Sequence, residues 1–165
     1  MGIIADSSPL ISCARAGKVK LIRYVYPKIV IPPSVYREIV VEGAGKPGAE
    51  EIEEGISIWV EIKEPKDKRF VSMMRKHLGE GESEAIALAK ELNGYLLADE
   101  RKVINEARRY GIRIKSTLLM LLEAKEKGLI PSIRAELDEL IASGFRCSRA
   151  LYQEILALSD ELSIP

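Results

Sequence analysis

The chain has 165 residues, an apolar fraction of 47% and a formal net charge of zero. That length allows one domain with a substantial core and is short for two domains, and no apolar run is long enough to span a membrane. The balanced charge argues against a protein that holds nucleic acid mainly through a large basic field. A local basic rim around an acidic centre is compatible with it.

The cysteines and the first residues of the chain indicate its compartment. Cys13 and Cys147 are far apart and have no metal-ligand spacing, so we expect small buried apolar residues and not a disulfide. Residues 1–6 have no basic segment and reach a charge too soon for a signal peptide. We therefore expect a protein of the reducing cytoplasm with no membrane attachment.

The first part of the chain alternates between short strands and helices. A strand over residues 2–5 is followed by Asp6 and by a helix that ends at Gly17. Further elements up to residue 62 are predicted as a strand at 28–31, a short helix through 35–39, an acidic helix at 47–54 and a strand at 56–62. The last of these rests on isoleucine and valine residues that alternate with polar ones.

The same alternation continues to about residue 130. Helices are predicted over 67–78 and 82–92, then a strand at 94–98, a helix that ends at Gly111, a strand at 112–114 and a helix over 117–127. The strand at 94–98 ends in Asp99, as the first strand ends in Asp6. Such near-continuous apolar runs are typical of a parallel sheet covered by helices on both faces.

The last part of the chain has a different pattern. Residues 132–165 predict two helices separated by Gly144, one with Leu137, Leu140 and Ile141 on its apolar stripe. The stripe of the other helix is predicted to contain Leu151, Ile155, Leu158 and Leu162. We divide the chain into a domain of residues 1–131 and a C-terminal helical extension of residues 132–165 packed on it. A contact with a second copy or a partner protein is the alternative use of these stripes.

Four acidic residues follow the carboxyl ends of the predicted strands: Asp6, Glu38, Glu82 and Asp99. Ligands of parallel sheets gather at this edge. Carboxylates drawn together there would repel one another by about 3 kcal/mol per pair at about 5 Å, with an effective dielectric of about 20. Oxygen ligands without histidine or cysteine suit Mg²⁺ or Mn²⁺. Taken singly, each acid has a simpler explanation as a helix cap or a partner of the helix dipole.

Four segments of the chain, residues 3–11, 30–39, 79–89 and 96–101, resemble the PIN-domain ribonucleases, in particular the VapC-like prokaryotic proteins. Together they extend over residues 1 to about 130. The resemblance implies an α/β protein with a three-layer α/β/α PIN-like fold, a central parallel sheet and, beyond it, C-terminal helices. It also implies a metal-dependent acidic centre that cleaves RNA.

The resemblance assigns roles to individual acids. Asp6 matches the first acid of the family, Glu38 the second, and Asp99 the acid after the fourth strand. The third acid is commonly aspartate; here Glu82 fits the position, and Glu84 is its rival. All four matched residues are therefore predicted to be catalytic and to hold Mg²⁺ or Mn²⁺.

Contacts with the substrate need other residues near these acids. Ser7 matches a small hydroxyl position beside the first acid, although capping a helix would explain it equally well. Arg101 and Lys102, on the helix after Asp99, are the cations nearest to the predicted site along the sequence. We expect these three residues to contact the substrate.

The sequence thus predicts an endoribonuclease, a hydrolase that cuts phosphodiester bonds of single-stranded RNA with one or two Mg²⁺ or Mn²⁺ ions. The resemblance further implies the toxin of a toxin–antitoxin pair, with an antitoxin protein as partner. The alternative is a catalytically weak PIN-fold module that binds nucleic acid or protein. The C-terminal helices exceed those of small PIN toxins, and they would cover the fold, form a homodimer or take the place of an antitoxin.

Overall fold

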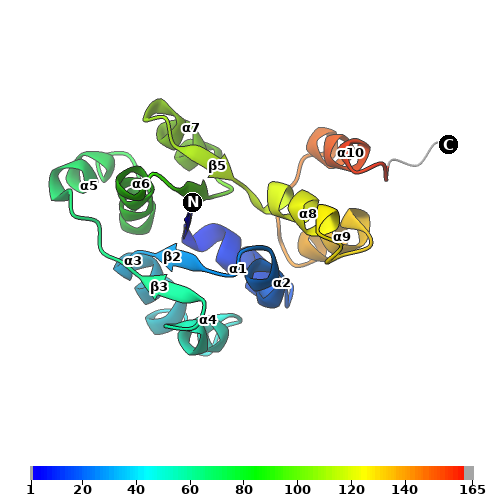
Figure 1. Cartoon of the computed structure of the whole chain (residues 1–165), viewed down its shortest axis with the longest axis horizontal. Helices are drawn as coiled ribbons and strands as arrows, with labels where there is room; N and C mark the ends of the chain where they lie inside the picture. Colours follow the sequence, from blue (N-terminus) through cyan, green and yellow to red (C-terminus); the bar gives the residue numbers. More distant parts are fainter. Residues whose placement is uncertain (1, 162–165) are drawn as a thin grey trace.

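The centre of the computed structural model, which describes residues 2–161, is a five-stranded parallel sheet in the order β3-β2-β1-β4-β5 (Figure 1). The strands are β1 (Ile3–Ala5), β2 (Ile29–Ile31), β3 (Val60–Ile62), β4 (Tyr95–Leu97) and β5 (Arg113–Lys115). Strand β1 pairs with both β2 and β4, so the predicted parallel sheet is confirmed. The two strands that precede Asp6 and Asp99 are neighbours.

Helices cover both faces of the sheet and complete three layers. One layer contains α5 (Lys68–Met74), α6 (Glu80–Leu92) and α7 (Arg101–Arg109). The opposite layer contains α1 (Ser7–Arg15), α2 (Val19–Val25), α8 (Thr117–Glu126) and α9 (Ile133–Ala142) (Figure 1). Successive strand residues face opposite layers: Ile4 packs with α5–α7, whereas Ile3 and Ala5 pack with the other helices. The predicted three-layer α/β/α fold is confirmed.

The chain after β2 leaves the sheet through an irregular helix. Helix α3 (Pro33–Tyr36) continues into a π-helical turn, η1 (Arg37–Val41), and a loop then leads to α4 (Ala49–Gly55). The N–H of Glu42 donates to the carbonyl oxygen of Arg37 at 2.8 Å, which is the five-residue spacing of a π-helix. Such turns occur frequently at functional sites, and this one carries Glu38.

The strand predicted at residues 56–62 begins only at Val60. Residues 57–59 form a turn, in which Ser57 has a φ of 66° and donates its N–H to the Val60 carbonyl oxygen at 2.9 Å. The prediction from the alternating pattern was wrong here because its isoleucine and valine residues do not share one buried face: Ile58 and Ile62 are 63% and 37% exposed, whereas Val60 is buried. Helix α2, directly after Gly17, was not predicted.

The C-terminal helices α9 and α10 (Arg149–Leu158) lie beside α8 (Figure 1). Helix α9 contacts α1 and α8, and Leu137 and Leu140 are fully buried in the same apolar cluster as α1. In α10 the buried residues are Ile155 and Leu156. The division of the chain after residue 131 stays a prediction.

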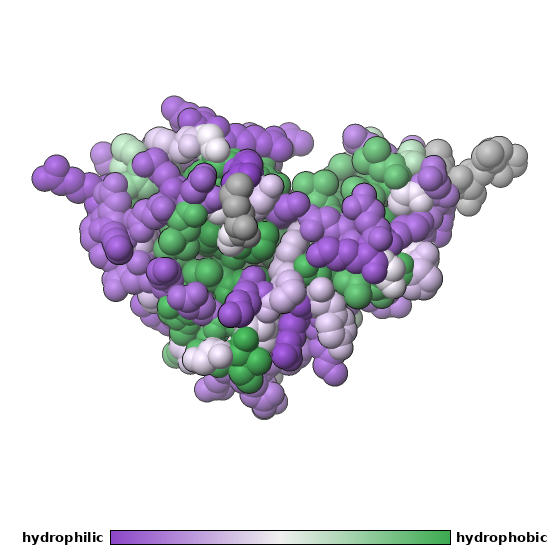
Figure 2. Space-filling view, viewed as in Figure 1, coloured by the Kyte–Doolittle hydropathy of each residue, from purple (hydrophilic) through white to green (hydrophobic). Residues whose placement is uncertain are grey.

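The stripe predicted for the last helix is therefore only partly correct. Leu151 and Leu158 are 40% and 66% exposed, and Leu162 lies outside the described residues. The space-filling view shows apolar residues on the surface of this part of the molecule, which an indentation separates from the larger part (Figure 2). Among residues 2–161, Leu151 and Leu158 are not members of either buried apolar cluster.

Two further observations concern the environment of the protein. Both cysteines are free thiols; Cys13 is buried, as predicted, whereas Cys147 is only half-buried, so the prediction for it was wrong. Across residues 2–161, no helix combines the length and the apolar character that crossing a membrane requires.

Candidate functional site

A pocket with a volume of about 320 Å³ opens at the carboxyl edge of the sheet. It is lined by residues that follow β1 and β4, by residues of α3 and η1 after β2, and by the first turn of α6: Asp6, Ser7, Ser34, Arg37, Glu38, Glu42, Gly79, Glu80, Gly81, Glu82 and Glu100. Six of these are carboxylates and one is a guanidinium. We call this hollow the acidic pocket.

Asp6 is the most deeply buried of the acids, with 1% of its surface exposed. Its N–H donates to the Leu97 carbonyl oxygen at 3.0 Å, which continues the β1–β4 ladder by one residue. Its carboxylate accepts the N–H of Ser7 at 2.9 Å and so caps α1. Strand pairing and capping together fix the first acid at the floor of the pocket.

The electrostatics of Asp6 show that other acids face it. The pKa of Asp6 is raised to about 7, mainly because the carboxyl group is buried, and against the opposing effect of the hydrogen bond from Ser7. The negative charges of Glu82, Glu100 and Glu38, in that order, contribute smaller parts of this increase in the pKa. Protonation of one of these carboxyl groups, a proton shared between two of them, or a bound cation would relieve this repulsion.

Glu38 reaches the acidic pocket from the π-helical turn. A Cβ atom added at Gly81 would lie 3.7 Å from its Oε2 and 3.3 Å from the nearest methyl of Val35. The carboxylate of Glu38 therefore extends from η1 to the first turn of α6.

The two rivals for the third acid have different environments. The carboxylate of Glu82 accepts the N–H of Gly79 at 2.9 Å, and its residue lines the acidic pocket. Glu84 instead accepts the hydroxyl of Ser34 at 2.6 Å and its N–H at 3.3 Å, which ties α6 to the start of α3. Of the two, only Glu82 lines the acidic pocket, which favours it over Glu84 as the candidate ligand.

Asp99, predicted as the fourth acid, does not line the acidic pocket. Its two carboxylate oxygens accept the N–H and the hydroxyl of Thr117 at 2.8 and 2.6 Å, at the start of α8. Burial raises the pKa of Asp99, while these two hydrogen bonds work to lower it. Its predicted role as a metal ligand stays a prediction, and its observed contacts are with α8.

Glu100, the next residue, lines the acidic pocket instead. Burial raises the pKa of Glu100, and both the charge of Glu82 and a shared hydrogen bond with that carboxyl raise it further. The sequence patterns did not single out this residue. The available signal was its place directly after Asp99 and before the helix α7, where it is the N-cap residue.

Of the three residues predicted to contact the substrate, one lines the acidic pocket and two do not. Ser7 lines it, and the cap of α1 is Asp6. Arg101 and Lys102 are exposed in the first turn of α7 and are not among the lining residues. The one cation among the described lining residues is Arg37, whose Nη1 is 3.6 Å from Glu80.

The donor set has the chemistry of a site for a hard divalent cation. Carboxylate oxygens suit Mg²⁺ and Mn²⁺, and the mutual repulsion at Asp6 provides a reason to bind one. Within residues 2–161, however, no three histidine, cysteine or acidic side chains already stand in an arrangement that could hold a metal ion. The carboxylate of Glu82, for example, is turned to a backbone N–H.

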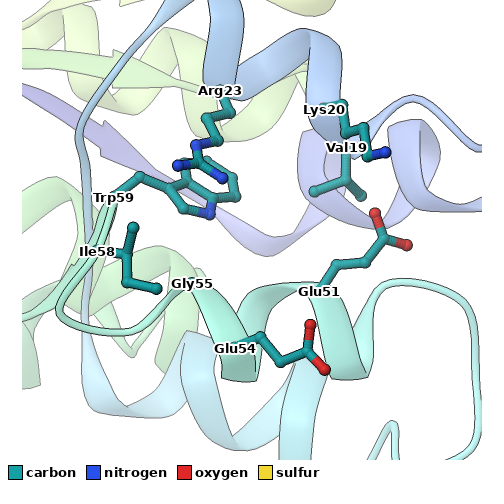
Figure 3. A pocket seen from close by; sticks show the side chains of 8 residues that line it. All are labelled: Val19, Lys20, Arg23, Glu51, Glu54, Gly55, Ile58 and Trp59. Carbon is teal, nitrogen blue, oxygen red and sulfur yellow. The ribbon is translucent and has the colours of Figure 1, made fainter.

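A separate pocket of about 220 Å³ lies between α2 and α4 (Figure 3). Lys20 and Arg23 project into it from α2, and Glu51 and Glu54 from α4. The indole of Trp59 forms one wall. This pocket shares no lining residue with the acidic pocket.

A five-stranded parallel sheet between helical layers, with acids beyond the carboxyl ends of its central strands, defines a PIN-type α/β domain. The sequence model of a PIN-domain family matches residues 2–161, and the chain therefore belongs to this family. The match includes helices α9 and α10. PIN domains are generally nucleases that act on RNA, and they typically use divalent metal ions.

The fold has a counterpart among solved structures. A PilT N-terminus domain protein from the hyperthermophilic archaeon Sulfolobus solfataricus P2 is 22% identical, with a TM-score of 0.50. The alignment covers 90% of this chain and 98% of that one. No match is found among curated proteins. The structural likeness supports the fold, and the narrower likeness to VapC-like ribonucleases stays a prediction.

Proposed function

We propose that the protein is a metal-dependent nuclease that hydrolyses RNA phosphodiester bonds at the acidic pocket. The observation that carries this proposal is the buried carboxylate of Asp6, which Glu38, Glu82 and Glu100 face from three other elements. A buried carboxylate that other negative charges face destabilises the folded state unless a bound cation or a proton neutralises part of that charge. Membership of the PIN-domain family supports the same activity.

In this proposal Asp6, Glu38, Glu82 and Glu100 hold the divalent cation. The ion, when bound, lowers the pKa of a water and stabilises charge on the phosphate oxygens. Ser7 keeps Asp6 oriented through its N–H. The side chains of Glu38 and Glu82 must turn from their present positions to share one ion.

The residues around these acids would position the site and the substrate. Asp99 anchors the start of α8 through Thr117, and this contact fixes the chain from which Glu100 projects. Arg37 can exchange its long contact with Glu80 for a phosphate oxygen. Ser7, Arg101 and Lys102 are further proposed substrate contacts, the latter two beside Glu100 in sequence.

The assignment of the fourth acid is tested with Asp6→Asn, Glu100→Gln and Asp99→Asn. We expect the first two variants to lose Mn²⁺ binding and cleavage of a fluorescent single-stranded RNA. Asp99→Asn should retain Mn²⁺ binding and lower the melting temperature, because its contacts are structural. Calorimetric titration with Mn²⁺, thermal melting and a cleavage assay provide the three measurements.

Glu50→Gln, an exposed acid of α4, is the matched control and should match the wild type in all three measurements. If Asp99→Asn loses Mn²⁺ at an unchanged melting temperature while Glu100→Gln retains it, Asp99 is the ligand and the assignment above is wrong. Cleavage by Asp6→Asn at the wild-type rate would refute the nuclease site as a whole.

The second candidate function is a catalytically weak PIN-fold module that binds RNA or protein. The observation in its favour is that no three candidate ligands within residues 2–161 are arranged around a common point. This function predicts RNA binding without turnover in Mn²⁺, equal in the wild type and in Asp6→Asn. The cleavage assay above therefore distinguishes the two.

The narrower proposal, a cytoplasmic toxin with an antitoxin partner, rests on the resemblance of the sequence to VapC-like proteins. Its test is expression of the chain alone in a bacterial host. A toxin should arrest growth, and Asp6→Asn should relieve the arrest at equal protein levels. Normal growth with abundant folded wild-type protein would contradict the toxin function and leave the nuclease proposal unaffected.

A further inference from the structure

A second cavity directly adjoins the acidic pocket. Its volume is about 240 Å³, and it shares Glu38 and Glu42 with the acidic pocket. The other residues that line it come from α1, η1 and the loop before α4: Ile11, Arg15, Ile39, Gly43, Lys46 and Pro47. We call it the flanking cavity.

The flanking cavity differs from the acidic pocket in its chemistry. Ile11, Ile39 and Pro47 provide an apolar wall, and Arg15 and Lys46 add two cations. Both cations are exposed, and neither forms an ion pair with any residue of the described range 2–161. They can therefore bind an anion without first breaking a contact.

Glycines at two positions allow the loop of the flanking cavity to lie against its neighbours. A Cβ atom at Gly43 would come 2.3 Å from the Ile39 carbonyl oxygen, and one at Gly48 would come 2.5 Å from the Cβ of Ala14. Gly48 also has a φ of 93°, which favours glycine. The loop thus turns tightly after η1 and packs on α1, and Lys46 of this loop and Arg15 of α1 line the same cavity.

We propose that the flanking cavity binds one nucleotide of a single-stranded RNA, next to the bond that the acidic pocket cuts. The base lies against Ile11, Ile39 and Pro47, and its phosphate contacts Arg15 and Lys46. This inference rests on the proposed function and adds to it a subsite for one nucleotide beside the acidic pocket.

Three physical arguments support this occupant. The carboxylates of the acidic pocket repel a phosphate backbone, so cations beside them are needed to hold the strand. The volume is below the range of about 300–1,000 Å³ for drug-sized ligands, which suits a single base. A base is free to leave its stack and contact an apolar wall mainly in a single strand.

The test measures binding of a fluorescein-labelled ten-nucleotide oligouridylate to the full chain by fluorescence anisotropy. Asp6→Asn is the background, so that the proposed cleavage does not consume the probe. Adding Arg15→Ala and Lys46→Ala should raise the Kd about tenfold. It should also lower the slope of log Kd against the logarithm of the salt concentration by about 0.7 for each cation removed. Adding Lys20→Ala and Arg23→Ala, which lie in the other pocket, is the matched control and should change neither quantity.

The apolar wall is tested separately in the same background. Ile11→Ser should weaken binding of the oligouridylate and leave binding of an abasic oligomer of equal length unchanged. The melting temperature of the Ile11→Ser variant shows whether this variant folds. If it does not fold, the ratio of the affinities of the Asp6→Asn chain for the oligouridylate and for the abasic oligomer decides instead. Equal binding of the two oligomers, or equal competition by a polyglutamate peptide of the same charge, would overturn the nucleotide subsite.

Failure of the subsite is distinguishable from failure of the proposed function. A chain with wild-type Asp6 that does not cleave RNA in Mn²⁺ refutes the nuclease, while the anisotropy result still decides the subsite. If the wild type cleaves, and Arg15→Ala with Lys46→Ala affects neither KM nor binding, the subsite is wrong and the nuclease stands. No binding of the oligouridylate by the Asp6→Asn chain also overturns the subsite.

Discussion

Asp6 illustrates how a single residue can oppose folding and serve a site. Its carboxylate is 1% exposed, and its pKa of about 7 lies well above the usual value of 3.8. The folded chain therefore holds a proton that the unfolded chain releases between these two values. Stability must fall as the pH rises through this window, because ionisation then favours the unfolded state.

Replacement of this carboxyl by an amide should stabilise the protein when no metal is present. We expect Asp6→Asn to raise the free energy of unfolding by about 2–4 kcal/mol at pH 8 and by little at pH 4, since the amide oxygen still caps α1. Urea unfolding in EDTA at the two pH values measures this. Asp67→Asn, in an exposed capping aspartate of α5, is the control and should show no such difference.

The same experiment with Mn²⁺ should reverse the order of stability. A ligand that binds only the folded state stabilises it by an amount that grows with the logarithm of the ratio of its concentration to its Kd. The asparagine variant lacks one carboxylate donor, so Mn²⁺ should stabilise it less than the wild type. A lower stability of Asp6→Asn than of the wild type at pH 8 in EDTA would show that the buried carboxylate is compensated within the protein.

At the scale of elements, Glu161 joins the end of the chain to two helices. Its carboxylate accepts the N–H groups of Ile133 and Arg134 at 2.7 and 3.0 Å, at the start of α9. It also accepts the hydroxyl of Ser132 and the ammonium group of Lys125, which belongs to α8. A carboxylate at the N-terminus of a helix is also favoured by the helix dipole.

These contacts determine how this region responds to acid. Burial works to raise the pKa of Glu161, but the hydrogen bonds from Lys125, Arg134, Ile133 and Ser132 outweigh it and hold the pKa at about 2. A lowered pKa gives stability that is present above the unfolded value of 4.5. This stability is lost as the pH falls toward 2.

We expect Glu161→Gln to lower the free energy of unfolding by about 2 kcal/mol at pH 7 and to remove the loss of stability between pH 4.5 and 2. Chemical unfolding across this pH range measures both effects. Asp160→Asn changes the adjacent, exposed acid and should preserve the wild-type profile. An acid response that survives in Glu161→Gln would place its origin elsewhere.

At the scale of the whole molecule, the C-terminal helices belong to the same buried apolar cluster as the helices on one face of the sheet. Leu137 and Leu140 of α9 belong to the same buried cluster as Ile22 of α2 and Leu121 of α8. A buried Lys18 adds ion pairs to Glu136 and Glu139. Unfolding of α9 alone would expose apolar surface on α1 and α8, the two helices that it contacts.

We therefore expect a single thermal transition for the whole chain. Leu137→Ala should lower the stability of that one transition by about 2–5 kcal/mol, because it leaves a cavity in the shared core. Ile141→Ala, four residues on and 38% exposed, should cost much less. Scanning calorimetry that shows two transitions, with Leu137→Ala moving only one, would mean that the C-terminal helices fold as a separate unit.

Much of the architecture was predictable because its signals are local. Apolar runs such as residues 2–5 and 94–98 indicate strands covered on both faces, and Asp6 and Asp67 cap the helices that follow them. The pattern at 56–59 was misleading, because alternation specifies a strand only where a neighbour continues the pairing. There Ser57 turns the chain back onto Val60 instead.

The candidate site was predictable to the level of its chemistry. Asp6, Glu38 and Glu82 were identified from their places after strands and at helix starts, and they line one pocket. Glu100 was not identified, because its neighbour Asp99 also follows strand β4 and is the residue type that matches the family's acid there. Arg37 was missed because a lone arginine on a helix has no distinctive pattern.

The sequence by itself determined most of the order of strands and helices, except for helix α2, together with the parallel sheet and the presence of acids at its carboxyl edge, since period, caps and breakers act over a few residues. Only the tertiary structure decided which carboxylates meet. The contact of Thr117 with Asp99 turns that acid toward α8 and leaves Glu100 to the pocket. Such a choice depends on partners distant in the chain, whose positions arise only when the layers pack together.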